Sequence, residues 1–235
     1  RSQIAYSQKD FSNYMFSNID SFARSVVYEN DIYKLTTQLT ANYFNEVEKA
    51  RSIFIWITEN ISYDYKFVNK GKEIKSPSCD ESKDCSIKLK DWENNYINKV
   101  LEKKKGICDG YSRLFKRMCE IAGLKCEIIS GRARTEPYQV GNPTSVNHSW
   151  NAILIDSSYY FLDATWAAGF CTKDEETEKL VKFQKQYNNY YWLTPFKKLV
   201  RNHYPENGRW VYEENYPKEK FFQNPYYAHG VIESI

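Results

Sequence analysis

Several features that define specialised protein classes are scarce or missing in this chain of 235 residues. It contains no run of 18 apolar residues, which is the length that a membrane-spanning helix needs. Its net charge is only +3, whereas nucleic-acid-binding proteins usually carry a larger basic excess on one face. We therefore expect neither a membrane span nor a nucleic-acid partner; oligomeric state is left open.

Cysteine and histidine are sparse, and their spacings do not predict a metal site. No Cys-x2-Cys pair is present, and the three histidines, at positions 148, 203 and 229, show no ligand spacing. We expect no metal and no cofactor. Six cysteines are also too few for a disulfide-rich mini-protein. Cys79 and Cys85 flank a polar loop, and they are either bridged or free; Cys119 and Cys126 are expected to be small buried hydrophobes.

What the chain does contain is typical of a globular protein. Hydrophobic residues make up 42% of the sequence and aromatic residues 17%, and 20 Tyr stand against two Met. The length suits one large domain. We divide the chain into an N-terminal arm over residues 1–44, a main domain over 45–215 and a C-terminal tail over 216–235 that packs on the domain.

Apolar periodicity predicts helices followed by strands. Steps of three and four residues indicate helices over 45–60, over 91–104 and after Cys108, where Gly123 is a plausible stop. Residues 124–130, 148–155 and 159–166 are typical of strands, and the last two form an antiparallel hairpin around a turn of Asp156, Ser157 and Ser158. Residues 69–86 are expected to be a loop, 171–182 a connection or short helix, and 20–27 short helical turns.

Cys108 stands at the entrance of the most strongly amphipathic helix, in the sequence Gly-Ile-Cys-Asp-Gly-Tyr. Unpaired N–H groups and the helix dipole stabilise a thiolate at such a position, so the pKa of the thiol falls. Nucleophilic catalysis also needs an imidazole to share the proton and a carboxylate or amide to orient that imidazole.

The hairpin supplies both groups. If the turn places Asp163 opposite Trp150, Asp163 lies on the same face as His148 and within side-chain reach. A slip of one residue would move Asp163 to the other face. Each residue also has an ordinary interpretation, because Cys108 could be an inert core residue, His148 a structural one and Asp163 a turn former.

Three segments resemble the core of the transglutaminase-like superfamily. These are Gly106-Ile-Cys-Asp-Gly-Tyr-Ser112, Asn147-His-Ser-Trp-Asn-Ala152 and Tyr160-Phe-Leu-Asp-Ala-Thr-Trp166, and later segments are similar to the kyphoscoliosis peptidase branch. The resemblance implies an α+β, papain-like fold with the nucleophile helix packed on an antiparallel sheet. It also implies Cys108 as nucleophile, His148 as general base and acid, and Asp163 as orienting group.

The resemblance does not fix the reaction. Members of the family cleave peptide bonds, cross-link glutamine to lysine or deamidate amides, always through a cysteine thioester. Hydrolysis of a protein or peptide substrate is favoured, because the chain lacks the acidic loops of calcium-dependent cross-linking enzymes. The alternative is a catalytically silent binding or scaffold module. Trp150 and Trp166 flank the expected site and either contact substrate or pack within the hairpin.

Two features bear on the compartment. The chain begins Arg-Ser-Gln rather than with Met, and a Cys79–Cys85 bridge would need an oxidising environment. Both favour a secreted or periplasmic protein of bacterial origin. A catalytic thiol must stay reduced, which favours the cytoplasm instead.

Overall fold

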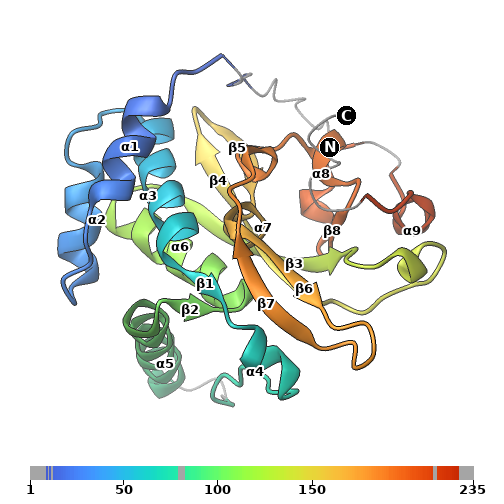
Figure 1. Ribbon diagram of the computed structural model, residues 1–235. Coiled ribbons are helices and arrows are strands. Elements are labelled where there is room, and N and C mark those ends of the chain that lie inside the picture. The colour runs from blue at the N-terminus through green and yellow to red at the C-terminus, as the bar shows by residue number, and fades with distance from the viewer. Residues whose placement is uncertain (1–8, 10, 12, 79–82, 214–215, 228–235) are drawn as a thin grey trace.

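The computed structural model describes residues 9, 11, 13–78, 83–213 and 216–227. At its centre lies an antiparallel sheet of four strands in the order β5-β4-β3-β8. The strands are β3 (Cys126–Ala133), β4 (His148–Ile155), β5 (Ser158–Leu162) and β8 (His203–Pro205). Helices lie on one side of this sheet and the C-terminal segments on the other (Figure 1). The expected α+β class, with the helix after residue 107 packed on the sheet, is confirmed.

Alternate residues of a strand point to opposite faces of a sheet, and in β4 both sets are apolar. Ile153 and Ile155 of β4 belong to the core shared with the helices. Trp150 and Ala152 belong to a second core, which the C-terminal segments complete. The sheet is therefore an internal layer between two cores.

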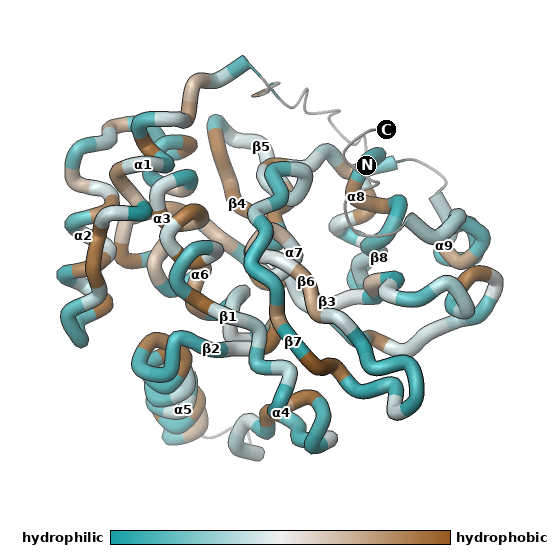
Figure 2. The backbone as a smooth tube through the Cα atoms, in the orientation of Figure 1, coloured by the Kyte–Doolittle hydropathy of each residue, from teal (hydrophilic) through white to brown (hydrophobic). Residues whose placement is uncertain are grey.

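Helix α3 (Glu46–Asn60) runs through the first core, as its apolar pattern predicts. Asn45 caps it by accepting a hydrogen bond from the Glu48 N–H. Helices α1 (Ser17–Ser25) and α2 (Ile32–Thr40) pack against it. The expectation of mere helical turns near residues 20–27 missed α2, whose Leu35 and Leu39 are buried in the same core. Helices α6 (Cys108–Ile121) and α5 (Lys83–Lys103) both carry hydrophobic and hydrophilic positions (Figure 2), and the apolar Ile97, Val100 and Leu101 of α5 are buried in the first core.

The segment before residue 108 brings α5 and two short strands beside α6. Helix α5 begins eight residues earlier than the expected 91, inside the predicted loop. Strand β1 (Ser62–Tyr63) pairs in parallel with β2 (Lys105–Gly106), and α4 (Tyr65–Asn69) follows β1. Cys85 is disulfide-bonded, and its expected partner, Cys79, lies outside the described residues. Within the described ranges, no helix has both the length and the apolar character to cross a membrane.

Residues 169–185 form a hairpin of β6 (Gly169–Lys173) and β7 (Leu180–Lys185), so the expected connection or short helix was wrong. The side chain of Asn69 pairs with both backbone groups of Leu180 and thereby ties β7 to α4. The predicted strand 159–166 was too long: β5 ends at Leu162, and α7 (Ala164–Ala168) follows.

Short elements cover the other face of the sheet. They are η1 (Pro137–Gln139), α8 (Phe196–Leu199), η3 (Gly208–Trp210) and α9 (Lys218–Gln223). The short element η2 (Asn189–Tyr191) instead contacts α7, and its Tyr191 is buried in the first core. The buried Arg134 guanidinium donates to the carbonyls of Phe221, Asn224 and Pro225, which fixes the end of α9 to the loop after β3.

Candidate active site

Cys108 is the first residue of α6 and is partly exposed. The preceding residue, Ile107, provides no side-chain cap, and its carbonyl accepts the N–H groups of Gly110 and Tyr111. The first N–H groups of a helix have no intrahelical partner, so this end favours negative charge. The expected position of a cysteine at a helix entrance is therefore confirmed.

Two polar contacts join the first turn of α6, which begins at Cys108, to β4. The hydroxyl oxygens of Ser112 and Ser149 lie 3.1 Å apart, and the Asn151 side chain donates to the Ser112 carbonyl at 3.0 Å. Ser112 is one turn after Cys108, and Ser149 follows His148 in the chain. These contacts hold the first turn of α6 against the first residues of β4.

The β4–β5 turn sets the register that the candidate site needs. Asp156 and Ser157 both have positive φ, as a tight two-residue hairpin turn requires. The ladder pairs Asn151 with Leu162, so Asp163 follows opposite Trp150, as predicted. His148 Nε2 lies 2.7 Å from Asp163 Oδ2.

Asp163 is held by more than the hairpin. It is the N-cap of α7, and its Oδ1 accepts the N–H groups of Thr165 at 2.8 Å and Trp166 at 3.1 Å. The change from strand to helix at this residue thus fixes the carboxylate and leaves Oδ2 for His148. Fully buried, Asp163 nevertheless has a pKa well below its usual range, since the charge and hydrogen bonds of the histidines outweigh its desolvation.

The electrostatics favour a thiolate beside an imidazolium. Burial alone would raise the pKa of the Cys108 thiol, but hydrogen bonds with His148 and Ser149 and the charge of His148 outweigh it and lower that pKa. Burial would likewise lower the pKa of His148, but Asp163 and Cys108 raise it to about 10. Because His148 Nε2 faces Asp163, the hydrogen bond between His148 and Cys108 Sγ must involve the other ring nitrogen, Nδ1.

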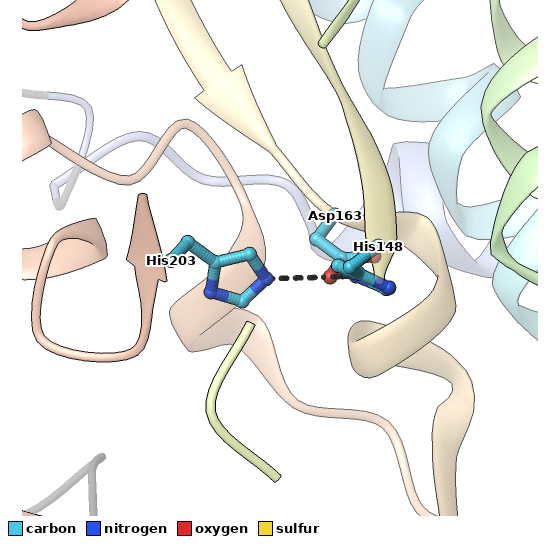
Figure 3. A group of neighbouring side chains, drawn as sticks. All are labelled: His148, Asp163 and His203. Carbon is cyan, nitrogen blue, oxygen red and sulfur yellow. Dashed lines mark hydrogen bonds and ion pairs between the residues drawn. The ribbon is translucent and has the colours of Figure 1, made fainter. Parts of the chain in front are cut away.

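A second histidine contacts the same carboxylate, and the sequence analysis did not identify it. His203, the first residue of β8, is completely buried, and its Nε2 lies 3.0 Å from Asp163 Oδ2 (Figure 3). It enters the site because β8 pairs with β3, opposite Ala133. No local spacing links it to Asp163, which precedes it by 40 residues. The residues around it, Arg201 and Asn202 before and Tyr204 after, form no pattern that marks it as part of a site.

The cluster of His148, Asp163 and His203 has the residue types of a metal site, with ligand atoms within 4.8 Å of one another. Zinc ligands at about 2.0 Å from a tetrahedral ion lie about 3.3 Å apart. Here the carboxylate oxygen is 2.7 and 3.0 Å from the two ring nitrogens, which are hydrogen-bond distances. The carboxylate oxygen therefore contacts each ring nitrogen directly, as in a hydrogen bond.

A cavity of about 770 Å³ opens beside His148. Trp166 lines it, together with Tyr63 and Cys171, and the ion pair of Lys173 with Glu136 lies at its wall. Trp150, the other tryptophan considered as a substrate contact, is 1% exposed and packs against the His203 ring. Both indoles lie beside the His148 ring, but Trp166 lines the cavity and Trp150 does not.

Comparison with known proteins adds a family to this geometry. A family model described as the transglutaminase-like superfamily matches residues 33–164, which is more than half of the chain. The chain is 28% identical over 215 residues to kyphoscoliosis peptidase of Mus musculus, covering 91% of this chain and 29% of that protein.

The chain is also similar to a fly protein and to a solved structure. Hillarin of Drosophila melanogaster is 26% identical over 205 residues, which cover 83% of this chain and 22% of that protein. A solved structure of a TGase is 16% identical with a TM-score of 0.39, over 80% of this chain and 40% of that one. This chain spans less than a third of the mouse and fly proteins.

Proposed function

The chain belongs to the transglutaminase-like superfamily, and on that premise we propose that it is a thiol-dependent enzyme that acts on peptide or amide bonds. Hydrolysis is the favoured reaction. The observation that carries the proposal is the pairing of Cys108 with His148, whose ring Asp163 holds from the other side. An inert core cysteine would be desolvated and protonated, whereas burial here is outweighed by a cationic partner.

The proposed reaction has two steps. The Cys108 thiolate attacks the substrate carbonyl, a C–S bond forms, and His148 gives its proton to the leaving amine as the C–N bond breaks. Water then attacks the thioester, His148 takes a proton from that water, and the C–S bond breaks to release the acid and restore the thiolate. The Cys108 N–H, at the uncapped start of α6, is the natural donor to the oxyanion.

The substrate chain is proposed to lie in the cavity beside His148. Its wall offers aromatic surface from Trp166 and Tyr63, with charges from Lys173 and Glu136. This mixture suits a polypeptide, whose apolar side chains and polar backbone need both kinds of contact.

The experiment incubates the full chain with a mixture of peptides and analyses the products and the intact protein by mass spectrometry. We expect cleaved peptides and an acyl adduct on Cys108, and both disappear in Cys108→Ala. The matched control is Cys119→Ala, which removes a buried thiol from the same helix and retains cleavage. An added primary amine that is incorporated into the products would identify a cross-linking enzyme rather than a hydrolase.

The competing function is a silent binding module. Intact peptides, no adduct on Cys108 and identical results for wild type and Cys108→Ala would favour that module and contradict the proposal.

The compartment remains a prediction. The curated relatives at 26–28% identity are a mouse and a fly protein, and they give no support to the expected bacterial, exported origin. The disulfide at Cys85 favours an oxidising compartment, whereas the proposed thiolate needs a reducing one.

A further inference from the structure

One carboxylate oxygen in the candidate active site serves two histidines. Asp163 Oδ2 lies 2.7 Å from His148 Nε2 and 3.0 Å from His203 Nε2, while Oδ1 is occupied by two backbone N–H groups. In Figure 3 the two rings approach the carboxylate from different elements, β4 and β8. A cysteine–histidine–aspartate arrangement needs only one of these rings, so His203 requires an explanation of its own.

We propose that His203 is a positioning residue for the reaction at Cys108: a neutral ring that donates its Nε2–H to Asp163 and limits how strongly that carboxylate holds the His148 proton. This inference rests on the proposed function for its kinetic consequence. Its structural content, a shared carboxylate with a neutral second histidine, can be tested without any substrate.

The hydrogen-bond count supports the assignment of protons. An ionised carboxylate only accepts, and Asp163 accepts four hydrogen bonds, which is its capacity. Both histidines must therefore present an N–H at Nε2. Burial without solvent contact disfavours a second cation in contact with His148, and it lowers the pKa of His203.

A neutral His203 with its proton on Nε2 needs a donor at Nδ1. That nitrogen lies 2.6 Å from the atom assigned as Asn202 Oδ1, and the atom assigned as Nδ2 lies 3.0 Å from the Tyr191 hydroxyl, so the required donor is present only when these two amide atoms are exchanged. The two ends of an amide have nearly the same shape, and the hydrogen-bond network decides which is which. With its NH₂ toward His203 and its oxygen toward Tyr191, the Asn202 amide satisfies all three residues. Asp163, His148 and Tyr191 are the titratable groups that face this ring.

Packing fixes the orientation of the ring. The His203 ring contacts Trp166 at a centroid distance of 4.6 Å and 65°, and Trp150 at 5.0 Å and 84°. The two indoles flank the imidazole, exclude water and leave its Nε2 directed at Asp163. This gives the buried Trp150 a place in the site as a support for His203 rather than as a substrate contact.

The kinetic consequence follows from sharing one oxygen. A carboxylate that served His148 alone would stabilise the imidazolium more strongly, and a more basic His148 gives its proton less readily to the leaving amine. The hydrogen bond from His203 Nε2–H to the same Asp163 oxygen reduces the stabilisation of the His148 imidazolium. We therefore expect loss of the His203 N–H to lower kcat while KM stays unchanged, because His203 is buried away from the substrate cavity.

The test is an NMR titration of the histidine rings in the full chain carrying Cys108→Ala, which removes the coupled thiolate. In this background His203→Phe keeps an aromatic ring but removes the donor, and we expect the pKa of His148 to rise by about one unit. His203→Gln places an amide N–H near the former Nε2 and restores the parent value. Tyr204→Phe, which removes a hydrogen bond to Tyr216 from the same strand, is the control and leaves the pKa of His148 unchanged.

Two results would overturn the inference. One is an unchanged pKa of His148 in His203→Phe. The other needs no substitution at 203: ring ¹⁵N shifts in the Cys108→Ala chain that report His203 as a cation or as the Nδ1–H form between pH 6 and 8. Absence of catalytic turnover in the wild type would contradict the proposed function alone, since the titration does not depend on activity.

Discussion

At the scale of single residues, two cysteines of one chain are expected to react very differently. Cys108 has a lowered pKa through His148, whereas burial without a cation raises the pKa of Cys171 to about 11. At pH 6.5 we expect iodoacetamide to alkylate Cys108 at least about 100-fold faster than Cys171, because the thiolate is the reacting form. Peptide mapping by mass spectrometry measures both rates in the same sample.

His148→Ala should remove most of this difference. The sulfur stays partly buried but loses its cation, so the pKa of the thiol rises above its ordinary value and labelling at pH 6.5 slows by at least about tenfold. Similar rates at both cysteines in the wild type, or an unaffected Cys108 in the variant, would show that His148 does not stabilise the thiolate.

The same pair makes a prediction about stability. The raised pKa of His148 contributes stability that is complete below its unfolded value of about 6.5 and is lost as the pH rises toward 10. The lowered pKa of Cys108 acts in the opposite sense, since its contribution grows with pH up to the unfolded value near 9. In the wild type the two slopes offset each other between about pH 7 and 9.

Cys108→Ala removes the second slope and the part of the His148 pKa shift that Cys108 causes, but it leaves the slope that Asp163 gives to His148. The free energy of unfolding of this variant, measured with urea, should therefore fall relative to the wild type by on the order of 2 kcal/mol between pH 6.5 and 9. Comparing the two curves cancels other titrating groups such as Lys185, whose pKa is lowered to about 8. Parallel curves would mean that Cys108 is not ionised in the folded chain.

Residue types, their order and the resemblance to a known family carried the prediction of Cys108, His148 and Asp163. The hairpin register was a condition of that prediction, and in the structure it comes from a turn of two residues rather than the expected three. His203 could not be predicted in this way. It reaches Asp163 only through the pairing of a three-residue strand with β3, and such a contact depends on the whole sheet. The contacts of Ser112 with Ser149 and Asn151 were missed for the same reason.

At the scale of elements, the sequence predicted the helices α3 and α6 well, but it did not predict the β6–β7 hairpin or the end of β5. Helices α3 and α6 have apolar stripes of their own, so their local pattern is sufficient. The hairpin of β6 and β7 is charged and largely exposed, and its strands are stabilised by each other and by Asn69. Strand β5 ends early because Asp163 caps α7, a choice between strand and helix that a run of apolar residues does not reveal.

One glycine determines how closely three strands meet beneath the site. A Cβ on Gly131 of β3 would lie 2.3 Å from the Tyr204 carbonyl oxygen and 2.4 Å from Trp150 Cη2. Backbone on one side and a packed indole on the other cannot both move, so we expect Gly131→Ala to lower the free energy of unfolding by about 2–3 kcal/mol. Urea denaturation measures the change.

The matched control is Gly208→Ala, because a Cβ there meets nothing within 4 Å. It should change the free energy of unfolding by less than about 0.5 kcal/mol. Equal effects of the two substitutions would show that the sheet adapts at Gly131 more easily than its contacts indicate.

At the scale of the whole molecule, the two ends of the chain complete the two cores. Leu35 and Leu39 of α2 are buried against the helices of the first core. Phe221 and Phe222 of α9 are buried in the second, on the opposite face of the sheet. A domain limited to residues 45–215 would expose both layers, although these limits enclose Cys108, His148, Asp163 and His203. It would also lack Tyr226 and Tyr227, which line the cavity beside His148.

We therefore expect neither end to be removable without loss of the fold. A chain without residues 1–44 also loses Asp20, which makes two 2.8 Å hydrogen bonds to the buried Arg51 of α3; an unpaired buried charge of this kind costs about 3–5 kcal/mol. A chain without residues 216–235 leaves the Arg134 guanidinium without its carbonyl acceptors. Because a domain is stable by only about 5–15 kcal/mol, each shortened chain should melt at least about 10 °C lower or fail to fold. Calorimetry of both chains beside the full one measures this, and an unchanged melting temperature in either chain would show that the end it lacks is not needed for the fold.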